Sequence, residues 1–452
     1  MRKFFTTIFL SLFVFSTLTG VAVSQIDKET IKDLYAQVEL FSYALTTIQS
    51  EYVEEKSPQD LIYGSLKGML SSLDAHSQFL SPEEYEDLKT ETQGEFGGLG
   101  IEISIRDGLL TVITPIEDTP AWEAGLQAQD RIVKIEDEIT KDMTLSDAVK
   151  LLRGKPGTDV TITVLREEDF KIMDFTITRE VISIQDVKNT QILTDKVGYI
   201  RLTEFREHSA EEFHKALAKL KELGADSMIL DLRNNPGGLL NVAIDITEEF
   251  LPEGSLIVST KGRRASQTSE TYSRTTENKI LKWPVAILIN AGSASGSEIL
   301  AGALKDNNRG VIVGTKSFGK GSVQSVIPLP DGSGLRLTTS KYYTPSGVSI
   351  HKTGIIPDIV VKPIDRELEE KDETAQNLEN IFRQVESEDE DQQKKEDMTE
   401  KEREVHDRLM SDNQVQAAIN VLKGIKVYKA QNGDSAETAE EKKKKEAAET
   451  AG

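Results

Sequence analysis

The spacing of apolar residues changes several times along the chain, and each change predicts a different kind of structure. From residue 25 to 91, apolar side chains such as Leu40 and Ala44 recur three or four positions apart, which predicts helices. From 92 to 180 the apolar runs are short and predict strands, interrupted by one amphipathic helix over Leu145–Arg153. A helical region is therefore followed by a small β-rich module.

Between residues 181 and 364, predicted strands and helices alternate. Helices are expected between the strands, the first of them opened by a capping box at Ser209–Glu212 and closed by Gly224. This alternation predicts an α/β (α+β) core with several parallel strands in a mixed sheet. Apolar runs place its strands at 197–202, 227–232, 285–290, 311–314, 323–329 and 335–342, and helices at 237–250 and 295–305.

Residues 365–452 form a charged tail with 25 acidic and 15 basic residues. Like-charge clusters of this kind are typical of solvated segments, so the tail is expected to be partly disordered. One stretch differs, because Val415–Ile425 has apolar residues at helical spacing after a capping Asp412. The tail is therefore expected to be partly helical, with this helix packing either on the core or on another protein.

The first 24 residues are typical of an export signal. Arg2 and Lys3 precede an apolar run, no charge follows until Asp27, and small residues at Ala22-Val23-Ser24 offer a cleavage site. This order predicts a signal peptide over residues 1–24, although the uncharged stretch would also suit an uncleaved membrane anchor. Either form predicts an extracytoplasmic protein, most simply in a bacterial periplasm, soluble or associated with the inner membrane.

Composition narrows the classes of function. The 452-residue chain carries a formal charge of -22, which argues against nucleic acid as its partner. The absence of cysteine excludes disulfides, zinc–thiolate sites and a cysteine nucleophile. Five histidines without an H-E-x-x-H motif argue against a histidine-rich metal centre. No metal and no cofactor is therefore predicted.

The module over 92–180 carries the elements of a peptide-binding groove. Glycines before a strand leave backbone N–H groups free for a carboxylate, and the strand edge can pair with an extended peptide. With Thr119–Leu126 and Asp130, the module resembles a PDZ domain, although Gln129 stands where such domains usually have glycine. The resemblance implies capture of a protein C-terminus with apolar last residues. The expected groove residues are Gly98, Leu99, Gly100, Ile101, Leu145, Val149 and Leu152.

Two familiar motifs share one lysine, and neither fits its surroundings. Gly314-x4-Gly319-Lys320 follows an apolar strand like a nucleotide-binding P-loop, but Gly321 replaces the magnesium-binding hydroxyl and a strand follows instead of a helix. Ser317-x-x-Lys320 has the spacing of a penicillin-binding motif, which requires a helix that the neighbouring glycines disfavour. Lys320 therefore needs another partner.

A better partner lies where the strand at 285–290 turns into a helix. A serine in the turn over 291–299 would lie at the carboxyl edge of the sheet, near the positive end of a helix dipole and near backbone N–H donors. Because the histidines show no obvious Ser/His/Asp arrangement, a desolvated lysine is the candidate base. Lowering the pKa of a lysine from about 10.4 to about 7 costs about 4 kcal/mol, so apolar strands must keep Lys320 dry.

Together these motifs resemble the carboxyl-terminal processing peptidases, also called tail-specific proteases. The resemblance implies a serine protease core with an inserted PDZ-like domain, and roles for five residues. Ser295 would be the nucleophile, Lys320 its general base, Gln324 the residue that orients the lysine, and Gly238 and Gly296 the oxyanion-hole donors. The matching segments are 73–85, 152–158, 231–238, 292–299, 317–324 and 342–350.

Other polar residues near these motifs are expected to have structural roles. Ser293 and Ser297 are interpreted as helix caps, and Asp306 as structural rather than catalytic. Arg233 is interpreted as a salt-bridging core residue, outside the site.

The sequence thus predicts an exported serine endopeptidase that recognises the C-terminal tail of protein substrates and cleaves through a Ser–Lys acyl-enzyme mechanism. The alternative is a non-enzymatic periplasmic PDZ scaffold that tethers protein C-termini. The expected partners are protein or peptide substrates, with membrane association through the N-terminal segment and a homo-oligomer or an adaptor as further possibilities.

Overall fold

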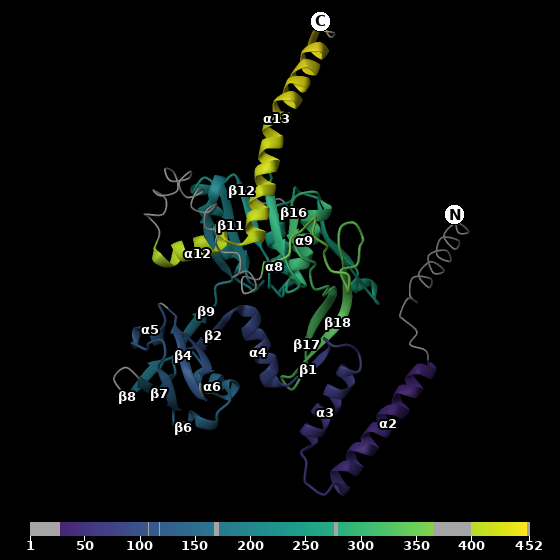
Figure 1. Cartoon of the computed structure of the whole chain (residues 1–452). Coiled ribbons are helices and arrows are strands. Elements are labelled where there is room, and N and C mark those ends of the chain that lie inside the picture. The colour runs from purple at the N-terminus through teal and green to yellow at the C-terminus, as the bar shows by residue number, and fades with distance from the viewer. Residues whose placement is uncertain are drawn as a thin grey trace, which may run out of the picture. The chain divides into compact units, whose positions relative to one another are not determined.

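The structure is a computed structural model that describes residues 28–106, 108–116, 118–166, 171–274, 279–364 and 399–449 (Figure 1). The predicted signal peptide and much of the acidic tail lie outside these residues. The chain divides into two compact units, Met1–Phe79 and Leu80–Gly452, which are described separately. Within the described ranges, no helix is long and apolar enough to span a membrane.

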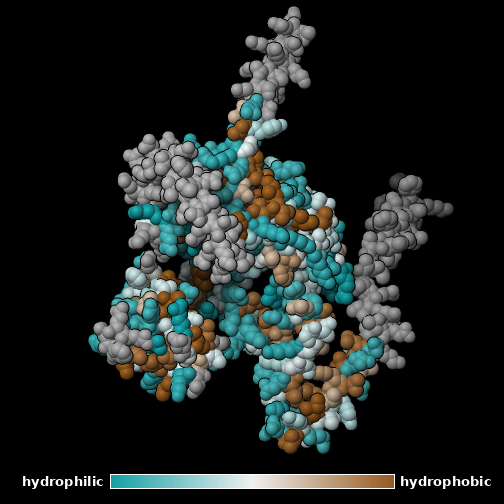
Figure 2. Space-filling model, viewed as in Figure 1, coloured by the Kyte–Doolittle hydropathy of each residue, from teal (hydrophilic) through white to brown (hydrophobic). Residues whose placement is uncertain are grey.

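The first unit confirms the predicted N-terminal helices. It contains α2 (Lys28–Glu51) and α3 (Pro58–Ser71), and the side chain of Ser57 caps α3 by accepting from the Asp60 N–H at 3.0 Å. Helix α2 exposes large apolar side chains within its unit, several of them brown in Figure 2. They include Leu34, Tyr35, Val38, Leu40, Phe41, Tyr43 and Ile48.

The first helix of the second unit is α4 (Pro82–Gln93), which Ser81 caps. Ser81 and Glu84 form a reciprocal capping box, and Gly94 ends the helix with a left-handed φ of 76°. A two-stranded antiparallel ribbon follows, in which β2 (Glu95–Gly98) pairs with β9 (Glu180–Ser183). This ribbon, which the sequence did not predict, joins both ends of the β-rich module.

The module itself has the predicted strands and the predicted amphipathic helix, α6 (Leu145–Leu152). Its sheet has the order β3-β4-β5-β7-β8, with β6 paired to β5. Buried residues of these strands and of α6 form a core of their own. The remaining elements are β3 (Ile101–Arg106), β4 (Leu109–Pro115), α5 (Pro120–Glu123), β5 (Arg131–Ile135), β6 (Glu138–Ile139), β7 (Asp159–Arg166) and β8 (Lys171–Thr178).

The α/β core is built on a mixed sheet of the order β10-β11-β12-β15-β16-β19. Only β10 in this sheet is antiparallel to its neighbour, and the pairs from β11 to β19 are all parallel. Parallel strands place their carboxyl ends at one edge, which is where the predicted catalytic turns begin. The strands are β10 (Val187–Ile192), β11 (Val197–Leu202), β12 (Ser227–Asp231), β15 (Val285–Ile289), β16 (Val311–Gly314) and β19 (Ile359–Val360).

Helices cover both faces of this sheet because alternate strand residues are apolar on each side. One face packs against α7 (Ser209–Glu222), α8 (Leu240–Glu248) and α9 (Gly296–Asp306). The other face packs against the C-terminal helices α12 (Glu400–Met410) and α13 (Asn413–Glu449), shown in yellow in Figure 1. Val415, Ala418, Ile419 and Leu422 are buried there, so the predicted helix in the tail packs on its own core.

A second, antiparallel sheet lies beside the core. Strand β18 (Gly334–Tyr343) pairs with β17 (Ser322–Pro328) on one side and β13 (Leu256–Gly262) on the other, and β13 also pairs with β14 (Ser269–Tyr272). Strands β17 and β18 were predicted, but β13 and β14 were not. Because β17 starts two residues after Lys320, neither the P-loop nor the penicillin-binding arrangement is present.

Two predictions about helix starts are wrong. Ser209 is the first residue of α7 rather than a cap, because its hydroxyl donates to Asp186 and the Glu212 carboxylate accepts from the N–H of Asp186. The helix predicted at 237–250 begins three residues later. Gly237 and Gly238 have φ values of 102° and 143°, which form a turn that a helix excludes.

Candidate active site

The turn between β15 and α9 holds Ser295 in a strained conformation. Its φ of 52° and ψ of -111° lie in a region that side chains with a Cβ rarely adopt. Gly237 packs against this turn so closely that a Cβ on it would lie 2.7 Å from the Ser295 Cβ. Ser295 is half-buried at the carboxyl edge of the sheet, directly before the first residue of α9. The sharp turn thus presents the hydroxyl at a strand-to-helix junction.

Ser293 and Ser297 do not cap α9, contrary to the prediction. Both are fully buried, and both hydroxyls donate to the loop that follows β12: Ser293 to the Leu232 carbonyl at 2.8 Å and Ser297 to the Asn235 carbonyl at 3.0 Å. These two serines therefore fasten the Ser295 turn to the neighbouring glycine turn.

The glycine turn after β12 supplies one of the predicted oxyanion donors. A Cβ on Gly238 would lie 2.2 Å from the Phe205 carbonyl oxygen, so only glycine fits there. Asn235 shapes the turn by accepting from the Gly237 N–H at 2.8 Å and donating to the Leu202 carbonyl at 2.9 Å. In the described part of the chain, the N–H groups of Gly238 and Gly296 have no protein acceptor. Both N–H groups are thus free to bind an oxygen of a ligand.

A buried carboxylate joins the Ser295 turn to the Lys320 loop. Oε2 of Glu298 accepts from the N–H groups of Ser295 at 2.9 Å and Lys320 at 2.8 Å. Oε1 accepts from the Ser317 hydroxyl at 2.5 Å and the Gly319 N–H at 2.7 Å. Burial raises the pKa of Glu298, and these hydrogen bonds oppose the rise. Glu298 therefore holds the two predicted catalytic segments in one arrangement.

The amine of Lys320 is partly desolvated, in the direction that the sequence argument requires. Lys320 is half-buried, and burial lowers the pKa of its amine below the ordinary lysine value. The positive charge of Arg336 on β18 lowers this pKa further. Both effects increase the neutral fraction of the amine near neutral pH.

Gln324 lies on β17 beside the lysine, but its hydrogen bonds go elsewhere. Its carbonyl oxygen accepts from Nε of Arg336 at 2.7 Å, and its amide nitrogen lies 3.5 Å from the Thr338 hydroxyl. Among the described residues, no hydrogen bond joins Gln324 to Lys320. The predicted orienting contact is therefore not made in this arrangement.

One cavity of about 570 Å³ brings most of the predicted site residues together. Ser295, Lys320, Gln324 and Gly238 line it, and Gly296 directly follows Ser295 in the chain. The rest of the lining is partly apolar and comes from α4, the glycine turn and the second sheet. It includes Leu88, Leu239, Leu240, Val323, Val326 and Tyr342.

The β-rich module has a small groove of about 90 Å³, separate from this cavity. Six of the seven predicted groove residues line it, namely Gly98, Leu99, Gly100, Ile101, Val149 and Leu152. The seventh, Leu145, is the first residue of α6, is 39% exposed and does not line the groove. The part of α6 that lines the groove is therefore its later turns.

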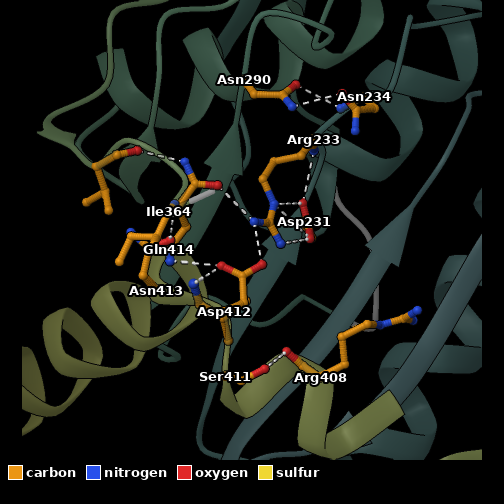
Figure 3. A network of polar contacts seen from close by, with 12 residues as sticks. Asp231, Arg233, Asn234, Asn290, Ile364, Arg408, Ser411, Asp412, Asn413 and Gln414 are labelled. Carbon is orange, nitrogen blue, oxygen red and sulfur yellow. Dashed lines mark hydrogen bonds and ion pairs between the residues drawn. The ribbon is translucent and has the colours of Figure 1, made fainter. Parts of the chain in front are cut away.

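Arg233 is the salt-bridging residue that the sequence predicted, at the carboxyl end of β12 (Figure 3). Its guanidinium pairs with Asp231 at 2.7 Å and with Asp412 of the C-terminal segment at 2.7 Å. It also donates to the Gln414 side chain at 2.8 Å. Figure 3 also shows the neighbouring pair of Asn234 and Asn290, which joins the ends of β12 and β15. Asp306 accepts from the Ser346 N–H at 2.9 Å, as a structural residue would.

The described residues contain no cluster of three or more His, Asp or Glu side chains that could hold a metal ion.

Comparison with known proteins decides the family. Residues 196–361 match the model of peptidase family S41, and residues 111–166 match a PDZ domain model. The chain is 42% identical to a carboxy-terminal-processing protease of Bartonella bacilliformis, over 77% of this chain and 81% of that protein. The chain belongs to peptidase family S41. It is a serine peptidase with a PDZ domain, related to the carboxy-terminal processing proteases.

A further curated relative agrees with this assignment. The carboxy-terminal processing protease CtpB of Bacillus subtilis is 35% identical over 76% of this chain and 71% of its own. Among solved structures, a photosystem II D1 C-terminal processing protease is 30% identical, covering 72% of this chain and 92% of its own, with a TM-score of 0.42.

Sequence reasoning missed Glu298, Asn235 and Arg336. A signal for Glu298 was present, since Ser295-x-x-Glu298 before an apolar run has the spacing of a capping box. The contacts of Asn235 and Arg336 depend on how separate strands pack, and no local pattern in the sequence indicates them.

Proposed function

We propose that the chain is an exported serine endopeptidase in which Ser295 is the nucleophile and Lys320 its general base. The observation that supports this best is the shared cavity: Ser295, Lys320 and Gly238 line the same space. Glu298 bonds to both catalytic segments, which favours a fixed arrangement of serine and amine over an accidental one. Membership of a peptidase family favours the enzyme over a non-enzymatic scaffold.

The proposed chemistry uses only groups of this chain. Neutral Lys320 removes the proton from the Ser295 hydroxyl as its oxygen attacks the carbonyl carbon of the scissile bond. The oxyanion binds between the N–H groups of Gly238 and Gly296. Protonated Lys320 then donates its proton to the leaving amine, which releases the C-terminal product and leaves an acyl-enzyme. Water, deprotonated by Lys320, hydrolyses this ester and restores the serine.

We assign Gln324 a positioning role that depends on a change of partner. Its carbonyl oxygen is bound by Arg336, so it can orient the Lys320 amine only after this hydrogen bond is released or shared. Substrate entering the cavity beside Arg336, which also lines it, is the natural trigger.

The PDZ groove is the proposed site of substrate recognition. The backbone over Gly98–Gly100 lines the groove and can bind a terminal carboxylate, and the apolar lining from Leu99 and Val149 suits an apolar last side chain. A substrate peptide and its C-terminally amidated form should differ strongly in affinity for this groove. Equal affinities would refute carboxylate recognition.

The proposal places the protein outside the cytoplasm, on the strength of the N-terminal sequence pattern alone. If the signal is retained, the same segment anchors the enzyme to the membrane. The exposed apolar face of α2 supports self-association or binding of an adaptor, since a face of this kind is typical of an interaction site. The mass of the purified full-length protein in solution tests this, and a monomer without any bound partner would contradict it.

Single substitutions test the dyad. Ser295→Ala and Lys320→Ala should each abolish cleavage of a peptide with an apolar C-terminus, whereas Lys316→Ala, on the exposed part of the same loop, should not. Circular dichroism must show that all three variants fold. Full activity in either of the first two variants would remove that residue from the proposed mechanism.

A further inference from the structure

A second cavity, of about 720 Å³, opens at the same sheet edge, away from Ser295 and Lys320. It lies between β10, β11, the ends of β12 and β15, and the C-terminal helix α12. Among the described residues that line it, four are cationic, namely Lys188, Arg201, Arg233 and Arg408, and one is acidic, Asp412. This concentration of positive charge is unusual in a chain whose formal charge is -22.

Among the described residues, only one of these four cations, Arg233, has a carboxylate partner. Arg233 pairs with both Asp231 and Asp412, as Figure 3 shows. The guanidinium of Arg408 makes no contact in that network. In the described residue ranges, no carboxylate pairs with Arg408, Lys188 or Arg201. Three positive charges therefore face the cavity without a counter-ion from the described residues.

The strand register places two of these positive charges opposite one another, which lowers the stability of the sheet. Lys188 and Arg201 are direct partners across the antiparallel β10–β11 pair, so both side chains lie on the same face. Like charges placed opposite one another destabilise a sheet. The register shifts just beyond Lys188, where Asn189 has a φ of 56°. A bound anion would convert this repulsion into two favourable contacts.

We propose that this cavity binds a small, multiply charged oxyanion of the phosphate class, held between Lys188 and Arg201 of the sheet and Arg408 of α12. A tetrahedral oxyanion suits this set, because its several oxygens can accept from cations on different elements at once and arginine pairs with it in a bidentate manner. The bound anion would link α12 to the strand edge, beside the turn where Asn234 and Asn290 join the ends of β12 and β15.

The test measures binding of inorganic phosphate to the full-length chain, in the Ser295→Ala background to prevent self-cleavage. Calorimetry and the thermal unfolding midpoint are compared in phosphate and in sodium chloride of equal ionic strength. We expect saturable binding and a higher midpoint in phosphate alone. Lys188→Gln combined with Arg201→Gln, and separately Arg408→Gln, should each weaken binding by at least about tenfold, since a charged hydrogen bond contributes about 1.5–3 kcal/mol.

A matched control is available on the second sheet. Lys261 and Lys341 are also direct cross-strand partners, on β13 and β18, but neither lines this cavity. The pair Lys261→Gln and Lys341→Gln removes the same charge and should leave phosphate binding unchanged. Equal effects of phosphate and chloride, or equal losses in the control and the Lys188/Arg201 variant, would overturn the proposal. Arg408 lies on an exposed surface of α12, so Arg408→Gln should not disturb folding. Its effect on phosphate binding therefore tests the proposal even if the Lys188/Arg201 variant fails to fold.

Discussion

Replacing Glu298 by glutamine tests whether this carboxylate positions the catalytic segments. Each carboxylate oxygen accepts two hydrogen bonds, one pair from Ser295 and Lys320 and the other from Ser317 and Gly319. Whichever way the new amide turns, its NH₂ group faces two donors. Hydrogen bonds to a charged acceptor contribute about 1.5–3 kcal/mol each, so Glu298→Gln loses about 3–6 kcal/mol of local interaction.

The loss of global stability should be much smaller than this. The raised pKa of Glu298 means that folding favours its neutral form, so above the unfolded-state pKa the buried charge itself lowers stability as pH rises. A neutral amide removes that cost, which is several kcal/mol for a buried ion. We therefore expect the free energy of unfolding to change by about 2 kcal/mol or less. The freed Ser295 turn and Lys320 loop should instead shift relative to each other.

The effect should appear in kcat. A displacement of about 1 Å between reacting groups can cost about 100-fold in rate, and we expect a loss of that order in kcat with little change in KM. Steady-state cleavage and urea unfolding measure the two quantities. Glu248→Gln is the matched control, because Glu248 is equally buried and bonds to Arg274 away from the cavity. A Glu298→Gln enzyme with the kcat of the wild type would refute the positioning role.

Three further substitutions make separable predictions. Because the charge of Arg336 lowers the pKa of Lys320, Arg336→Gln should move the acidic limb of the kcat/KM profile to higher pH, and an unmoved limb would exclude this influence. Gly238→Ala should reduce kcat by about 10²–10³-fold through a displaced oxyanion donor, with KM nearly constant; wild-type kcat would remove Gly238 from the oxyanion hole. Asp412→Asn should lower the free energy of unfolding in urea by only about 1–2 kcal/mol, because Arg233 keeps Asp231 as a partner. An unchanged unfolding midpoint would show that docking of the C-terminal segment does not need the pair of Arg233 and Asp412.

The parts of the fold that sequence predicts well are those with the strongest burial. The strands at 197–202 and 311–314 have the expected bounds, because they are apolar on both faces and are bounded by polar residues or glycine. Strands β13 and β14 were missed since their sequences mix polar and apolar residues without alternation. The pairing of β13 with β18, and of β14 with β13, stabilises them as strands although their local pattern does not predict it.

In the candidate site, too, the residues marked by local sequence are predicted, and the contacts made only on folding are not. Ser295 and Lys320 are marked by strand ends, glycines and motif order, all of which are local in the sequence. The contacts of Glu298 and of Asp412 are not, because each joins segments that only the folded chain brings together: Glu298 reaches the Lys320 N–H, and Asp412 reaches Arg233, 179 positions away. The misassigned Ser293 and Ser297 show the same limit, since a serine near a helix start predicts a cap unless a neighbouring loop offers a better acceptor.

A measurement of the pKa of the Lys320 amine tests most directly the central claim that this lysine is the general base. Titration of lysines labelled with ¹³C at Cε, in the Ser295→Ala protein and with Lys320→Ala to assign the signal, measures the pKa of this amine. The account predicts a value well below the ordinary value of about 10.4, so that a useful fraction of the amine is neutral near pH 7. An ordinary or raised pKa in the folded enzyme would contradict a lysine general base at this site.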